Sequence, residues 1–385
     1  MSVSAMMIGA CKKPYAPVIV RADSHILVVE GVINTGNDST VIKLNRTVNL
    51  SGKTTANPEA RAQVIVEGDQ QVSYTLTETD SGRYVSAPLN LDDTHKYRLN
   101  IKTADGRTYA SDYVEAKVTP PIDTFNYVIT GNGVNFYTST HDAANKTKYY
   151  RWEYTETYIY ESALSATYEF DNSYPATLQK FKLITPETQT HICYVTIPSS
   201  TIVLNSTAAL SQDVVINNPV AFVPSSSEKF YHRYSILTRQ YALTKEAYQF
   251  WSNLKKNTEQ IGSIFDAQPS EIKGNIHCTS DPAELVIGYV SAGTVMQKRL
   301  FIDNRDLPAW PVPASEGCTT QLLTWTDGAT PSELLSKVWE PVGSLNSVYN
   351  PAHQALDFSV KVGYYDCVDC RFHLHGINKK PAFWK

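Results

Sequence analysis

The chain has 385 residues, which is long enough for two or three domains that each bury a core of their own. Its net charge of −4 provides no field that would attract a polyanion, so the composition argues against nucleic acid as a partner. Charged residues make up 19% of the chain and 24 residues are tyrosine, which favours strands over helices. No apolar run approaches the roughly 20 residues that a membrane-spanning helix needs.

The first eleven residues are interpreted as a lipoprotein signal. They form a short apolar run ending in Ile8-Gly-Ala-Cys11, and an aliphatic residue, two small residues and a cysteine are typical of bacterial lipoprotein signals. The run lacks a basic region at its start and looks truncated, and the alternative is a chance cysteine in an ordinary stretch. We expect Cys11 to be the site of lipid attachment and residues 12–17 to form a tether. The folded body would then lie in an oxidising compartment.

Residues 18–119 are predicted to form an immunoglobulin-like or fibronectin-like β-sandwich. Short alternating runs such as His25–Ile33 are separated by turn signals such as Asp80-Ser-Gly82. Leu91, followed by Tyr97 at the start of a strand, resembles the tyrosine corner of such sandwiches. Pro120-Pro121 would form a stiff linker, which places the domain boundary there.

Residues 122–385 are predicted to form a larger domain of the β-sandwich type. Residues 149–160 alternate as one long strand with Tyr150, Trp152 and Tyr154 on the same face, which indicates half of a core. Further strands are expected at Ile192–Pro198, Phe230–Leu237, Leu285–Val290 and Lys298–Ile302.

One main helix is expected near residues 245–260. Thr244 can cap its start, Glu246 suits the positive end of the helix dipole, and a single apolar stripe follows at helical spacing. The helix should therefore lie against a sheet. The stripe consists of Ala247, Tyr248, Trp251 and Leu254.

The sequence contains no recognised catalytic motif. It has no Walker loop, no Gly-x-Ser-x-Gly and no His-Glu-x-x-His, and Gly131-Asn-Gly133 is interpreted as a hairpin turn because no helix follows it. We predict no catalytic residues, no metal and no cofactor. Paired glycosidase carboxylates come from separate strands and leave no motif, so a hydrolase stays open as an alternative.

Cys367-Val-Asp-Cys370, followed by His373 and His375, has four interpretations. A zinc site would use all four side chains, but the two histidines are closer together than structural zinc sites normally require. A redox pair would need a helix start that lowers the thiol pKa. Free or buried cysteines are the third interpretation, and a disulfide staple is the favoured one.

We expect one cysteine of this pair, Cys367 or Cys370, to be bonded to Cys318. The reason is that segments near a chain end are poorly ordered unless a bond or packing fixes them. Cys193 and Cys278 stay unassigned. Residues 371–375 are expected to form a strand, with Arg371, His373 and His375 on its polar side and Phe372 and Leu374 buried, while Phe383 and Trp384 dock as a plug.

Eight segments, in this order along the chain, carry a resemblance to a known family. They are Cys11, His25–Gly31, Tyr149–Tyr154, Leu243–Trp251, Pro269–Ile276, Ile287–Tyr289, and Cys367–Arg371 with Lys380–Trp384. Together they resemble the domain of unknown function 4249 family of outer-membrane-associated lipoproteins of Bacteroidota. Members tend to carry a glycine pair where this chain has His373-Leu-His375-Gly376, which weakens a metal site as a family function.

The resemblance implies no known enzyme activity but does imply a setting. Such lipoproteins often accompany TonB-dependent outer-membrane receptors, so we expect a non-enzymatic, lipid-anchored outer-membrane accessory or binding protein that acts in uptake. Its ligand and the membrane face it occupies are left open. The alternatives are a cell-envelope hydrolase acting on glycans or peptides, and a purely structural envelope component.

Overall fold

A computed structural model describes residues 25–48, 57–170, 181–259, 273–311, 317–326, 339–341, 346–350 and 355–385. They form two compact units. The first contains the described residues up to 116 together with 273–292, and the second contains the remainder. Cys11 and the expected tether 12–17 lie outside the described residues. Within the described part, no helix has both the length and the apolar character needed to cross a membrane.

The first unit is built on eight strands that are hydrogen-bonded in a closed ring. Their order is β6–β3–β4–β5–β2–β1–β20–β8, and β8 pairs back onto β6. Inward and outward side chains alternate, so Val64 and Val66 of β3 are fully buried while Gln63 is exposed. The prediction of a mainly β protein is confirmed, and these strands close on themselves. Their bounds are β1 Leu27–Asn34, β2 Ser39–Arg46, β3 Gln63–Gly68, β4 Ser73–Asp80, β5 Arg83–Pro88, β6 Lys96–Lys102, β8 Val114–Lys117 and β20 Ser291–Gly293.

The corner predicted at Tyr97 is present in this unit. The Tyr97 hydroxyl donates a hydrogen bond to the backbone carbonyl of Asp92 at 2.8 Å, and the ring of Tyr97 is buried. Leu91 is buried beside it in the same core. The corner fixes the turn that leads into β6.

A late segment of the chain returns to complete the first unit. β18 (Ile276–Cys278) pairs with β7 (Thr108–Ser111), and β19 (Val286–Gly288) lies parallel to β1. Gly288 has φ +142°, and a Cβ atom there would lie 2.2 Å from the Val29 carbonyl oxygen, so only glycine fits. The region expected to be one continuous domain from 122 to 385 is therefore interrupted by residues of the first unit.

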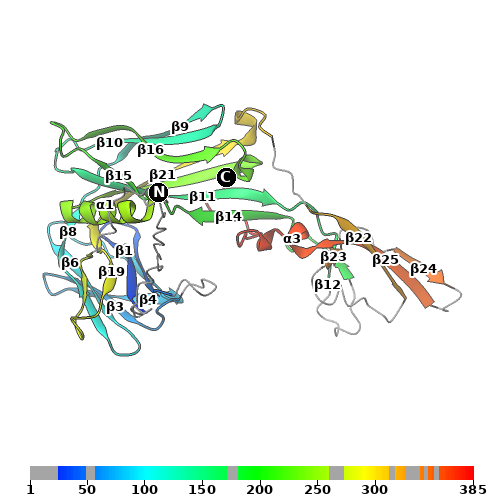
Figure 1. The fold of residues 1–385 in the computed structure, drawn as a ribbon, viewed down its shortest axis with the longest axis horizontal. Coiled ribbons are helices and arrows are strands. Elements are labelled where there is room, and N and C mark those ends of the chain that lie inside the picture. Colours follow the sequence, from blue (N-terminus) through cyan, green and yellow to red (C-terminus); the bar gives the residue numbers. More distant parts are fainter. Residues whose placement is uncertain are drawn as a thin grey trace, which may run out of the picture. The chain divides into compact units, whose positions relative to one another are not determined.

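The second unit contains two sheets that share a core (Figure 1). One has the order β16–β10–β9 and the other β14–β11–β17–β21, with β15 also paired to β11. Phe136 from the first sheet meets Tyr234 from the second, with ring centroids 5.7 Å apart. Thr130 pairs with Gly133, which confirms the hairpin predicted there. The bounds are β9 Ile122–Thr130, β10 Gly133–His141, β11 Tyr149–Glu161, β14 Ile192–Pro198, β15 Val203–Ser206, β16 Val214–Pro224, β17 Arg233–Ala242 and β21 Val295–Asp303.

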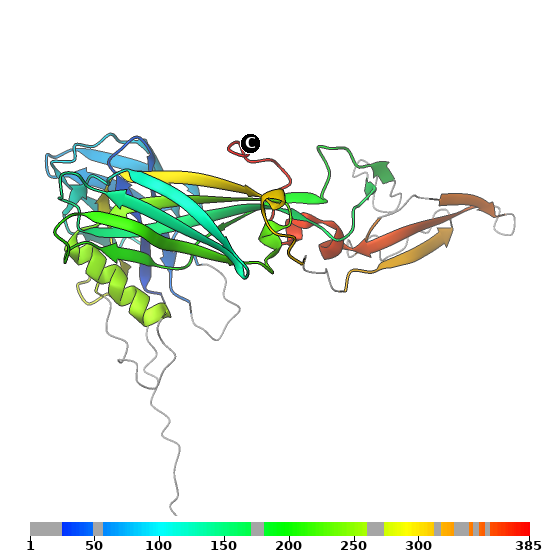
Figure 2. The same ribbon diagram turned by 90° about the horizontal axis from the view of Figure 1, so that it is seen from above.

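Helix α1 (Lys245–Glu259) is the main helix of the described chain, as predicted (Figure 2). The Thr244 hydroxyl accepts a hydrogen bond from the Ala247 backbone at 3.2 Å and so caps its start. Ala247 and Phe250 are its buried residues. The predicted apolar stripe included Trp251 in place of its neighbour Phe250. Arg151 of β11 lies 4.3 Å from the Trp251 ring and joins the helix to the sheet.

The remaining elements of the second unit include those that carry the C-terminal cysteines. β25 (Ala355–Tyr364) leads directly into the short helix α3 (Tyr365–Val368), and one turn of 3₁₀-helix, η4 (Cys370–Phe372), follows. The others are β12 Tyr168–Phe170, β13 Phe181–Leu183, η2 Glu228–Phe230, η3 Asn304–Asp306, β22 Thr320–Thr326, β23 Trp339–Pro341 and β24 Asn346–Asn350.

Candidate functional site

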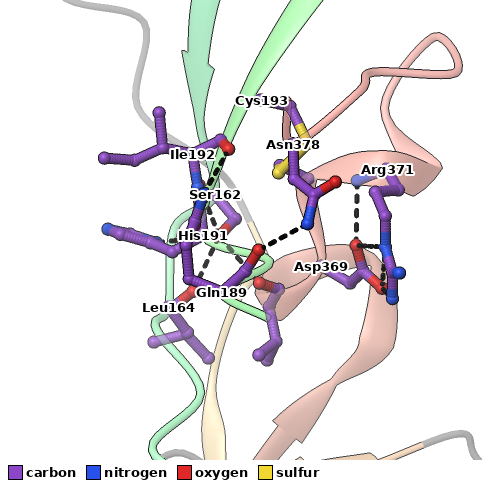
Figure 3. The surroundings of a disulfide bond; sticks show 11 residues. Ser162, Leu164, Gln189, His191, Ile192, Cys193, Asp369, Arg371 and Asn378 are labelled. Carbon is purple, nitrogen blue, oxygen red and sulfur yellow. Dashed lines mark hydrogen bonds and ion pairs between the residues drawn. A yellow bond between two sulfur atoms is a disulfide. The ribbon is translucent and has the colours of Figure 1, made fainter. Parts of the chain in front are cut away.

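Two disulfides hold the C-terminal segment. Cys193 of β14 is bonded to Cys370, with an S–S distance of 2.00 Å (Figure 3). Cys318 is bonded to Cys367, with an S–S distance of 2.04 Å. The structure thus pairs Cys318 with one member of the Cys367/Cys370 pair, as the sequence argument expected, and gives the other member a partner that the sequence left open. Cys278 is a buried free thiol in the first unit.

The two neighbouring cysteines lie on different helical turns and have different partners. Cys367 lies in α3 and Cys370 in η4, so both are on helical turns, and both are buried. Asp369 caps η4 by accepting from the Arg371 backbone at 2.9 Å, and its carboxylate also binds the Arg371 guanidinium. Because the sulfurs are bonded to Cys318 and Cys193, they are not available as a metal-binding or redox pair.

The prediction of a strand over residues 371–375 is wrong. The chain makes consecutive turns there, because Asp369 caps a helical turn and Leu374 and His375 adopt left-handed φ values of +46° and +56°. Phe372 and Leu374, expected to be buried, are 59% and 55% exposed. Trp384 docks as expected and is 6% exposed.

Ser162 is the hydrogen-bonding centre beneath the disulfide. Its hydroxyl lies 2.8 Å from the carbonyl oxygens of both Leu164 and Val368, and 2.9 Å from Nδ1 of His191. Asn378 adds a bond from its amide to the Gln189 carbonyl at 3.0 Å, which Figure 3 shows as a dashed line. The C-terminal segment is therefore joined to the end of β11 and to the loop before β14.

The neighbouring carboxylate of Glu161 lies between two histidines. One of its oxygens is 2.8 Å from Nε2 of His191 and the other is 2.6 Å from Nε2 of His232. Ser162, His191 and Glu161 thus form a hydroxyl–imidazole–carboxylate chain. Among the described residues, no group of three or more metal-binding side chains is arranged to hold an ion.

This chain of groups does not have the geometry of a hydrolytic triad. In serine hydrolases Nε2 faces the serine and Nδ1 faces the acid, whereas here the two nitrogens are exchanged. Ser162 is also 3% exposed, and its hydroxyl is surrounded by backbone carbonyl oxygens, which cannot stabilise an oxyanion. The arrangement ties segments together rather than presenting a nucleophile.

His373 of the C-terminal segment is also held in place. His373 stacks on Tyr160, and its Nε2 lies 2.7 Å from Oε1 of Glu228, which also accepts a hydrogen bond from the Tyr158 hydroxyl. Burial, together with the nearby Glu228 carboxylate, raises the pKa values of Tyr158 and Tyr160 above the ordinary range. Both phenols therefore stay protonated, and the Tyr158 hydroxyl remains a donor.

The outer side of the segment is apolar. Phe372, Leu374 and Ile377 are 59%, 55% and 61% exposed, and Ile192 on β14 is 40% exposed. Ile377 is fixed to Tyr194 by two reciprocal backbone hydrogen bonds of 2.8 and 3.0 Å. Residues 371–380, which we name the C-terminal loop, thus combine a rigid attachment with an exposed apolar tip. Sequence reasoning missed this, because alternation alone placed Phe372 and Leu374 inside.

A comparison with protein families agrees with the family resemblance seen in the sequence. The family model described as Domain of unknown function (DUF4249) matches residues 12–299, which is most of the chain. No curated protein matches. Among solved structures, a mutant of Salmonella alpha-2-macroglobulin aligns with 10% identity and a TM-score of 0.17, over 89% of this chain and 18% of that chain. A similarity at that level carries no argument about fold or function.

Proposed function

The chain belongs to the domain of unknown function 4249 family, and on that basis we propose a non-enzymatic, lipid-anchored accessory or binding protein of the outer membrane. In this proposal it acts beside a TonB-dependent receptor in uptake. The supporting observation is that four of its six cysteines form disulfides. Disulfides persist in oxidising compartments and are rare in the cytosol, so they favour an exported protein. We also propose that the first unit is related to immunoglobulin-like domains. The hydrogen bond of the Tyr97 corner supports this.

Lipid attachment at Cys11 is the part of the proposal that can be tested first. Cys11→Ser removes the thiol that would take the lipid, and we expect the protein to move from the membrane pellet to the soluble periplasmic fraction. The matched control is Cys278→Ser, which removes a free thiol buried in the first unit and should leave the fractionation unchanged. Retention of the Cys11→Ser variant in the pellet would contradict acyl anchoring.

The receptor partnership needs its own experiment. Crosslinking in native membranes, followed by mass spectrometry, should recover a TonB-dependent receptor with the wild-type chain. Recovery of no outer-membrane receptor would remove the partner from the proposal while leaving the anchor in place.

An envelope hydrolase is the alternative, and the Ser162–His191–Glu161 chain is where it can be tested, although the two imidazole nitrogens are exchanged relative to a serine triad. A fluorophosphonate probe that labels activated serines should leave the native protein unlabelled, because Ser162 is buried among carbonyl oxygens. Labelling that disappears in Ser162→Ala would overturn the non-enzymatic proposal.

A further inference from the structure

We propose that the C-terminal loop docks on an anionic lipid surface, as a second contact with the membrane that does not depend on an acyl chain. The loop would place its apolar tip, formed by Phe372, Leu374 and Ile377, among the lipid chains. Lys379 and Lys380 would then meet the phosphates of the headgroups.

The first support is the rigidity of the loop. The Cys193–Cys370 disulfide holds its start, and the Ile377–Tyr194 backbone pair holds its middle. Gly376 packs directly on the disulfide, because a Cβ atom there would lie 2.9 Å from Cβ of Cys193. Gly376 leaves no room for a side chain on this inner side, whereas Leu374 and Ile377 are exposed, and Phe372 is exposed although one edge of its ring contacts Tyr365.

The second support is backbone strain at the tip. Leu374 and His375 both have left-handed φ values, which are unfavourable for side chains other than glycine, asparagine and aspartate. Such strain persists only where the surrounding structure imposes it, and it is concentrated at functional sites. In this strained conformation Leu374 is exposed to solvent.

The third support is charge, and it selects the partner. The segment 371–385 contains four basic residues and no aspartate or glutamate, whereas the whole chain carries a net charge of −4. Arg371 is paired with the Asp369 carboxylate, so Lys379, Lys380 and Lys385 carry the positive charge. Lys379 and Lys380 are exposed and follow the apolar tip after one residue, Asn378. Apolar side chains beside lysines form the composition that lies at an anionic membrane interface.

The small area of the loop favours a lipid surface over a protein as its partner. A stable protein interface uses roughly 20 to 30 residues and 800 Å² on each side, which is more than a ten-residue loop offers. A bilayer interface requires only that a few apolar side chains enter and that cations reach the headgroups. The observations therefore favour a lipid surface.

The test uses the full chain carrying Cys11→Ser, so that no acyl chain contributes, and flotation with vesicles. The probes are vesicles of phosphatidylcholine alone and of phosphatidylcholine mixed with phosphatidylglycerol. We expect the protein to float with the anionic vesicles, to stay behind with the neutral ones, and to dissociate as salt is raised. Because neither lipidation nor a receptor is involved, failure here leaves the proposed function standing, and the reverse also holds.

Two pairs of variants assign the binding to the loop. Lys379→Gln with Lys380→Gln should lower partitioning about 25-fold, since each basic side chain at an anionic surface contributes about fivefold. The charge-matched control, Lys245→Gln with Lys256→Gln on α1, should leave partitioning unchanged. The control lysines are also exposed.

Leu374→Asn removes an apolar side chain and also relieves strain, since asparagine tolerates left-handed φ values. We expect it to lower partitioning about fivefold while the melting temperature holds or rises, which excludes unfolding as the cause. His375→Asn relieves strain without changing the apolar tip and should bind as well as the parent chain at neutral pH.

Three outcomes would overturn the proposal. The first is failure of the unacylated chain to float with anionic vesicles. The second is flotation at the parent level of Leu374→Asn and of the double variant Lys379→Gln with Lys380→Gln. The third is self-association or capture of a protein that is lost in Leu374→Asn while vesicle binding is absent, which would assign the loop to another copy or to a protein partner.

Discussion

The imidazole of His373 lies flat on the ring of Tyr160, with 3.8 Å between ring centroids and 5° between the planes. We expect His373→Ala to lower the free energy of unfolding by about 1 to 2 kcal/mol, because it removes both this stacking and the hydrogen bond to Glu228. His375→Ala is the matched control, since His375 is exposed, and urea unfolding would compare the two. Equal losses in both variants would show that the stacking contributes nothing.

The two disulfides should differ in how much they stabilise the protein. The Cys193–Cys370 bond spans 177 residues and the Cys318–Cys367 bond spans 49. Chain-entropy estimates give about 5 kcal/mol for the longer loop and about 4 kcal/mol for the shorter one, less any native strain.

Urea unfolding of Cys193→Ser with Cys370→Ser, and of Cys318→Ser with Cys367→Ser, would measure both losses. We expect the first pair to lose more. Non-reducing peptide mapping of the native protein checks the connectivity. A Cys367–Cys370 peptide, or four free thiols, would contradict it.

The docked tryptophan near the C-terminus should matter more than the phenylalanine beside it. Trp384 is 6% exposed and makes edge contacts with the rings of Tyr194 and Phe301, whereas Phe383 is 37% exposed. Trp384→Ala should cost about 3 kcal/mol and make the last residues accessible to protease, and Phe383→Ala should cost clearly less. Equal protection of the two variants in limited proteolysis would show that Trp384 does not hold the segment.

The pKa of His141 should lie above the ordinary histidine value. A hydrogen bond of 2.7 Å to the Asp123 carboxylate, together with its negative charge, raises the pKa of His141 above 6.5. The pair therefore stabilises the fold fully below about pH 6.5, and this contribution is lost as the pH rises through the raised pKa.

NMR titration of the His141 ring would measure this pKa directly. Asp123→Asn should lower it toward 6.5 and weaken the pH dependence of stability over that window. An unchanged titration curve in this variant would show that Asp123 is not the cause.

The elements that local patterns determine were predictable from sequence. Strand β14 occupies Ile192–Pro198, as alternation predicted, and Thr244 caps the helix expected after it. The Tyr97 corner was also predictable, because its hydrogen bond joins residues only five apart.

Apart from the bond of Cys318 to the C-terminal cysteine pair, features that depend on distant partners were not predictable. The sequence provides no signal that three residues, Ser291–Gly293, pair with strands of the first unit. The contacts of Glu161 with His191 and His232 depend on side chains 30 and more residues away. At Phe372 and Leu374, alternation predicted the wrong conformation because it does not include the cap at Asp369.

The closure of the first unit by β20 has a consequence for synthesis of the chain. β20 lies between β1 and β8 in the ring, so a ribosome must translate almost 300 residues before the ring can be completed. Until then β1 and β8 each present an unpaired edge, and exposed strand edges promote aggregation. A fragment that ends near residue 119 would keep those open edges permanently, so an expression experiment on this unit should include the chain through residue 293.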